Sequence, residues 1–159
     1  MKDSAFFEKQ KFTQPWVWVV LAASFLLPVF LPYFSGDEIN LINENSQSIV
    51  LFGILFLIFF YSLELRTSVN SSGIHYQFFP LHLKTYTIKF NEIEKIEACI
   101  YSPIKDYGGW GIRYRYKAKA YNIKGNEGVK VYLKNGRHIL FGSQCNKDFA
   151  NEINRFMKL

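Results

Sequence analysis

Residues 112–120 read IRYRYKAKA, from Ile112 to Ala120, and alternate without a break between uncharged and cationic side chains. Successive side chains of a β-strand point to opposite faces of the sheet. The pattern therefore predicts one strand with isoleucine, tyrosine and alanine facing a core. The opposite face would carry four cations: Arg113, Arg115, Lys117 and Lys119.

Alternation of the same kind occurs on both sides of this stretch. We expect seven strands, in the segments 65–69, 74–78, 85–90, 96–100, 112–120, 129–133 and 138–141. Asn135-Gly136 is a strong signal for a tight hairpin between the last two strands. From Asn146 onward, apolar residues recur at helical spacing at Phe149, Ile153 and Phe156, which predicts a C-terminal amphipathic helix.

Two long uncharged runs precede the strands. Residues 16–34 contain 19 residues without a charge, and residues 48–63 contain 16. At about 1.5 Å per residue, the first run reaches ~28 Å, close to the ~30 Å of a bilayer core. Two transmembrane helices are therefore predicted, at about 16–34 and 46–63. The alternatives are a cleaved signal peptide, for which the first run is too long, and a helical hairpin buried in a soluble core.

Charge is distributed unevenly around these runs. The segment 35–47 contains no Lys or Arg, whereas residues 64–159 contain 16 Lys and Arg against 8 Asp and Glu. Because positive flanks stay inside, this predicts a multi-pass protein of the inner or plasma membrane with both termini in the cytoplasm. In that reducing compartment Cys99 and Cys145 are expected to be free thiols.

Three regions result from this interpretation: a polar lead (1–15), read as a mobile tail, two transmembrane helices with a short acidic loop (16–63), and a β-rich domain (64–159). Seven strands followed by one helix is the order of a pleckstrin-homology-like (PH-like) domain. Such a domain is a sandwich or barrel of two nearly orthogonal sheets, of four and then three strands, capped by the helix.

The chain resembles the bacterial membrane proteins that have two N-terminal helices followed by a PH-like domain. Besides the helical pair, the resemblance is carried by the strand-turn-strand of residues 65–80 and by the segment 88–93, IKFNEI. The segment 108–113, GGWGIR, is similar to a feature of one small membrane family of unknown function. The resemblance implies a fold and a location but no reaction.

The cationic face is the candidate binding site. Arg113, Arg115, Lys117 and Lys119, with Trp110 behind them, could attract anionic lipid headgroups or an acidic protein partner. The alternatives are a strand face that is simply solvated, or an edge strand protected against aggregation. Trp110 is either an exposed aromatic contact or a side chain packed at a glycine turn.

No motif in the sequence points to catalysis, a cofactor or a metal. His75, His82 and His138 lie on separate segments without ligand spacing, and Glu92, Glu94 and Glu97 are interpreted as surface charge. A nucleic-acid module is not recognisable either. The sequence predicts a non-enzymatic, membrane-anchored PH-like module that binds a partner protein or anionic lipid. The alternative is an accessory or structural subunit of a larger membrane complex.

Overall fold

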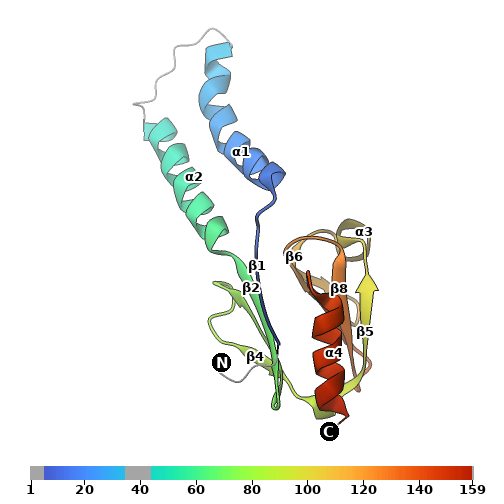
Figure 1. The fold of residues 1–159 in the computed structure, drawn as a ribbon. Coiled ribbons are helices and arrows are strands. Elements are labelled where there is room, and N and C mark those ends of the chain that lie inside the picture. Colours follow the sequence, from blue (N-terminus) through green and yellow to red (C-terminus); the bar gives the residue numbers. More distant parts are fainter. Residues whose placement is uncertain (1–5, 35–43, 159) are drawn as a thin grey trace. The chain divides into compact units, whose positions relative to one another are not determined.

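The computed structural model describes residues 6–34 and 44–158, which form two compact units. One unit is discontinuous in sequence: it combines the residues up to Lys11 with those from Leu63 onward. The other unit is Phe12–Ser62. Figure 1 shows the first as two sheets with helices and the second as a pair of helices.

The first sheet is antiparallel and has the strand order β1-β2-β3-β4. Its strands are β1 (Phe6–Lys11), β2 (Glu64–Asn70), β3 (Gly73–Phe79) and β4 (Tyr86–Ile88). The turn between β2 and β3 is closed by the side chain of Asn70, whose Oδ1 accepts a hydrogen bond of 2.8 Å from the Ser72 N–H.

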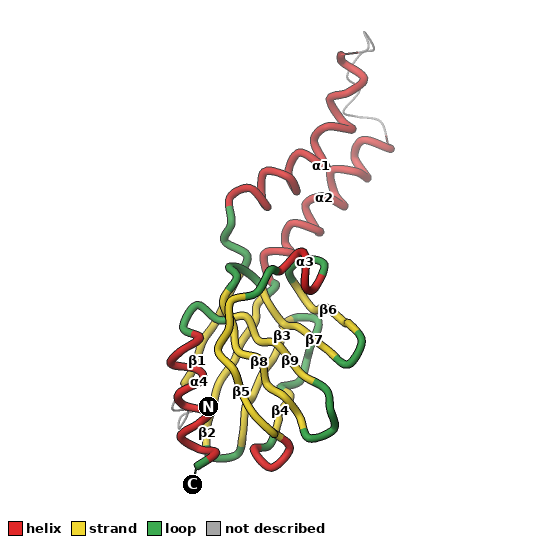
Figure 2. The backbone as a smooth tube through the Cα atoms, turned by 90° about the vertical axis from the view of Figure 1, so that its right-hand side faces the viewer, coloured by secondary structure: helices red, strands yellow, loops and turns green. Residues whose placement is uncertain are grey.

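The second sheet has the order β5-β8-β9-β7-β6. Its strands are β5 (Ile93–Ile100), β6 (Gly111–Arg115), β7 (Ala118–Asn122), β8 (Glu127–Leu133) and β9 (His138–Gly142). Strands β7 and β9 are parallel, whereas the other pairs of this sheet are antiparallel. As a result the β6–β7 and β8–β9 turns lie side by side at one end of the sheet (Figure 2).

The core lies between the two sheets and the C-terminal helix α4 (Asn146–Met157). Fully buried apolar side chains from all three include Leu65, Ile74, Phe78, Val131, Phe141, Phe149 and Ile153. Burial of each such side chain stabilises the fold by roughly 1.5–3 kcal/mol. The predicted helix is confirmed, because its apolar stripe packs on β5 and β8.

The outer face of the second sheet is covered by the short helix α3 (Pro103–Tyr107). Tyr101 and Tyr107 pack there on Ala120 and Leu140. A one-turn 3-10 helix, Phe90–Glu92, precedes β5.

The second unit consists of α1 (Pro15–Phe34) and α2 (Glu44–Ser62). Phe25 of α1 packs on Phe52 and Phe56 of α2, with ring centroids 6.0 and 5.5 Å apart. Gly53 permits this approach, because a Cβ there would lie 2.9 Å from the Phe25 ring.

Neither of these helices supports the predicted membrane anchor. Within residues 6–34 and 44–158, no helix combines the length and the hydrophobicity needed to cross a bilayer. The membrane-hairpin part of the predicted fold class was therefore wrong, as was the predicted multi-pass membrane location with both termini in the cytoplasm. The prediction depended on missing charge, which is a weaker criterion than apolar length: α2 starts with Glu44 and four further polar residues before Ile49. The acidic loop lies mostly outside the described residues.

The predicted seven-stranded PH-like arrangement of four and then three strands was also wrong. The described chain forms nine strands, in open sheets of four and five. One extra strand, β1, comes from the polar lead, which is not a mobile tail at residues 6–11. The other arises because residues 112–120 are two strands, β6 and β7, that pair with each other around a turn at Tyr116-Lys117.

Candidate functional site: a basic groove

An open groove of about 830 Å³ lies at the end of the second sheet where the two hairpin turns meet. We call it the basic groove. It is lined by Tyr76 of β3, by residues 114–119 of the β6–β7 segment, and by Leu133, Asn135, Arg137, His138 and Ile139 of the β8–β9 segment. None of the described residues that line it is acidic.

The parallel pairing of β7 with β9 positions the two sides of the groove. Ala118 is the register partner of His138, and the His138 N–H donates a 2.9 Å hydrogen bond to the carbonyl of Lys117. Lys117 itself adopts a φ of 54°, a left-handed conformation that lets the chain reverse after β6. The β6–β7 turn is thereby held beside the β8–β9 turn.

Lys119 is the most closely held cation of the groove. Its Nζ lies 4.7 Å from the ring centroid of Tyr114 and 4.8 Å from that of Tyr121. Tyr114 is its partner across the β6–β7 pair, so both side chains point to the inner face of the second sheet. Contact with two aromatic rings stabilises the ammonium group in place.

Two further cations belong to the hairpin turns. Lys117 Nζ lies 5.5 Å from the ring centroid of its neighbour Tyr116, which is 88% exposed. The carbonyl of Arg137 accepts a 2.8 Å bond from the Leu133 N–H. By strand alternation Arg137 shares its face with Leu133 and Ile139, both groove residues.

An aromatic wall closes the groove on the side of the first sheet. The ring centroid of Tyr76 lies 4.8 Å from that of Tyr121 and 5.6 Å from that of Tyr86, on which it stacks. His82 lies against the same rings, 5.5 Å from Tyr121. Burial, together with the positive charge of Lys119, lowers the pKa of His82 below its usual range. The imidazole is therefore mainly neutral at pH 7, and Lys119 is the charge at this wall.

The predicted site residues separate in the structure. Lys117 and Lys119 lie at the groove, whereas Arg113 and Arg115 point to the opposite face, where they pair in register with Ala120 and Ala118. Arg115 borders the groove, but its Nη2 is 3.5 Å from the carbonyl of Lys105 in α3. The four cations do not form a single face, because the turn at residues 116–117 reverses the alternation.

Trp110 lies at the other end of β6 and does not line the groove. Its Nε1–H donates a 3.2 Å hydrogen bond to the carbonyl of Gly125. The side chain is half-buried, in agreement with a packed turn and not with a fully exposed contact.

Sequence reasoning missed Tyr76, Asn135 and Arg137 as site residues. The Asn135-Gly136 turn was recognised, but its position beside residues 116–117 depends on the parallel β7–β9 pair, which no local pattern encodes. Tyr114 points to the inner face, as expected, but it is 72% exposed on an edge strand and does not enter the core. The expectation for Tyr116 was wrong, because this residue lies in the turn and is 88% exposed.

Several titratable groups with shifted pKa values lie on the outer face of the second sheet and do not line the groove. On the outer face, burial raises the pKa of Tyr101 and of Tyr107 to about 12 and raises that of the Cys99 thiol. In the described part of the chain, no group of three or more His, Cys, Asp or Glu side chains is placed to hold a metal ion.

Comparison with family models finds no family that matches the chain, and comparison with curated proteins finds no match either. The resemblance to bacterial PH-domain membrane proteins stays a prediction.

Proposed function

We propose that this protein is a non-enzymatic binding module whose basic groove holds an acidic segment of a partner protein. The observation that carries the proposal is the meeting of Lys117, Lys119 and Arg137 at one groove, where the described lining residues include no carboxylate. Positive surfaces of this kind attract acidic partners and raise the rate of association.

The shape of the site favours a chain segment as the ligand. A volume of about 830 Å³ is far more than a single inorganic anion occupies, and the site is a concave groove. A lipid bilayer presents a broad surface that a convex protein face contacts more readily than a groove. Exposed Tyr114 and Tyr116 add flat apolar contacts of the type that is enriched in protein interfaces.

Binding of a short fluorescein-labelled peptide of alternating Glu and Ser, measured by anisotropy with the full chain, tests the proposal. We expect binding that weakens as salt is added, because the attraction is between exposed charges. Lys119→Glu with Arg137→Glu should weaken it by about tenfold or more.

Lys147→Glu with Lys158→Glu is the matched control. It makes the same change in net charge at exposed positions in and after α4 and should leave the affinity unchanged. Lys119→Gln guards against misfolding of the reversal variant, and thermal unfolding checks each fold. Equal affinity of the groove and control variants would contradict the proposal. Binding to phosphatidylserine vesicles without binding to the peptide would replace the protein segment by a lipid headgroup.

A further inference from the structure

An exposed apolar surface adjoins the aromatic wall of the groove. In the segment that joins β3 to β4, Leu81 is 56% exposed and Leu83 is 81% exposed. Tyr86, at the start of β4, is 49% exposed. We call these three residues the apolar shelf. Exposed leucines are ordinary when scattered singly, but grouped apolar side chains mark interaction sites.

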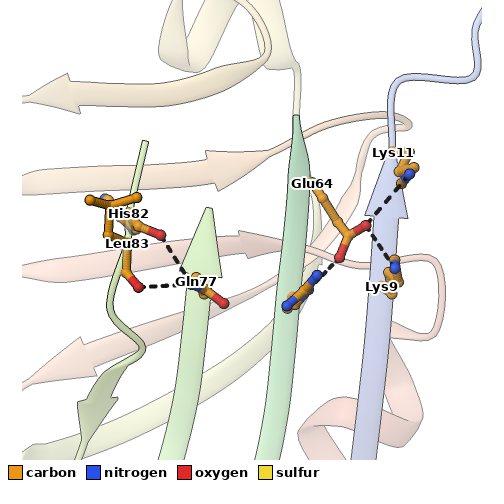
Figure 3. A network of polar contacts seen from close by, with 7 residues as sticks. Lys9, Lys11, Glu64, Gln77, His82 and Leu83 are labelled. Carbon is orange, nitrogen blue, oxygen red and sulfur yellow. Dashed lines mark hydrogen bonds and ion pairs between the residues drawn. The ribbon is translucent and has the colours of Figure 1, made fainter. Parts of the chain in front are cut away.

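Hydrogen bonds hold the shelf in one conformation. Gln77 Nε2 donates to the carbonyls of His82, at 3.0 Å, and Leu83, at 3.4 Å (Figure 3). The His82 N–H donates a 2.7 Å bond to the carbonyl of Phe78, which closes the segment on β3. The leucine side chains are therefore presented by a constrained backbone, which reduces the entropy lost on binding.

The shelf is continuous with the groove through two stacked rings. Tyr86 of the shelf stacks on Tyr76, the groove residue of the first sheet, at 5.6 Å. His82, between Leu81 and Leu83, lies 4.8 Å from Tyr86 and under the influence of the Lys119 charge. The contact between Tyr86 and Tyr76 thus places the shelf directly beside the groove.

From this continuity we infer that the partner segment is amphipathic: apolar side chains at one end of its acidic run pack on Leu81, Leu83 and Tyr86. The inference rests on the proposed function, because charge complementarity at Lys117, Lys119 and Arg137 selects the acidic part. The inference adds specificity to the proposed function. Cations attract many acidic segments, and an adjacent apolar contact discriminates among them.

The test compares peptides on the full chain. The first probe is the alternating Glu and Ser peptide. Two further probes carry two added Leu residues, one peptide at its N-terminus and the other at its C-terminus. The last probes are these Leu-bearing peptides with Gln in place of Glu. We expect one Leu-bearing acidic peptide to bind about five- to tenfold more tightly than the plain acidic peptide, as partial burial of leucine implies. The Gln versions should bind weakly.

The variant Leu81→Ser with Leu83→Ser should remove this gain and leave binding of the plain acidic peptide unchanged. Ile100→Ser, at an equally exposed isoleucine in β5, is the control and should keep the gain. Equal binding of plain and Leu-bearing peptides would overturn the inference while the proposed function stands, and so would a gain that persists in the double variant. If no acidic peptide binds at all, both fail.

Discussion

At the scale of single residues, Glu64 is a buried charge of the β-rich unit that is held by several ion pairs. Its side chain on β2 is 4% exposed and lies 2.8 Å from Lys9 Nζ on β1 (Figure 3). It also accepts a hydrogen bond from Arg66 Nε. Burial alone would raise the pKa of Glu64, but bonds to Lys9 and Arg66 outweigh it, so the pKa is lowered below its usual value. The ion pairs join β1 to β2.

We expect Glu64→Gln to reduce the free energy of unfolding by about 1–3 kcal/mol at pH 7, because it leaves neighbouring cations without their counter-charge. The pKa of Glu64 is lower in the folded than in the unfolded state. Its stabilisation is therefore present above the unfolded-state pKa and is lost as pH falls through the folded-state pKa. Urea unfolding from pH 7 down to pH 3 should show wild type and variant converge.

Glu94→Gln is the control, since Glu94 is exposed on β5. A difference between wild type and Glu64→Gln that stays constant over this pH range would show that the carboxylate charge does not stabilise the fold.

At the scale of elements, the β2–β3 turn determines where β4 can pair. Gly73 has a φ of 141°, and a Cβ there would lie 2.2 Å from the carbonyl oxygen of Ile88 in β4. Both the conformation and the close approach of the strands require glycine. Since Tyr86 of β4 stacks on the groove residue Tyr76, this turn also supports the aromatic wall.

Gly73→Ala should destabilise the protein by about 2 kcal/mol or more, because alanine is strained at this φ and clashes with backbone. Gly136→Ala is the matched control: its φ is 74°, and nothing lies within 4 Å of the added Cβ. It should cost only about 1 kcal/mol of backbone strain. Denaturant midpoints measure both, and equal losses would show that contact with Ile88 is unimportant.

At the scale of the whole molecule, the β-rich unit is interrupted by the helical unit. Lys11, the last residue of β1, is the register partner of Glu64, the first residue of β2. The two ends of the helical unit therefore enter and leave at neighbouring positions of one antiparallel pair, as the ends of a hairpin turn do.

Replacing Phe12–Ser62 by Asn-Gly should therefore leave a β-rich unit that folds by itself. With Leu63, the substitution makes a three-residue hairpin connection, a length that antiparallel pairs accept. Circular dichroism should show strand signal and one cooperative thermal transition. A version that also lacks residues 6–11 should be less stable, because β1 bonds to the end of β9 and the residue after it. Gln10 Nε2 donates a hydrogen bond to the carbonyl of Gly142, and Glu8 accepts one from the Ser143 hydroxyl. An unfolded shortened chain would show that the helical unit is needed for folding.

The site was partly predictable for a physical reason. Alternation along residues 112–120 indicates an extended backbone. The same pattern is expected whether the chain forms one long strand or reverses at Tyr116-Lys117 to form two paired strands. Lys117 is not a usual turn residue, so nothing local marked the reversal. Arg113 and Arg115 therefore point away from Tyr114, as the alternation predicts, whereas Lys119 points to the same face as Tyr114, so the four cations do not share one face.

Taken alone, the sequence determined most of the segments that form strands, where the amphipathic C-terminal helix lies and that the β-rich part is basic, because these properties depend on local periodicity and composition. Only the tertiary structure decided that residues 6–11 complete the first sheet, that β7 runs parallel to β9, and that Arg137 joins Lys117 and Lys119 at one groove. Such pairings join residues far apart in the chain, and their energy comes from burial and backbone bonding between strands, which no local pattern records.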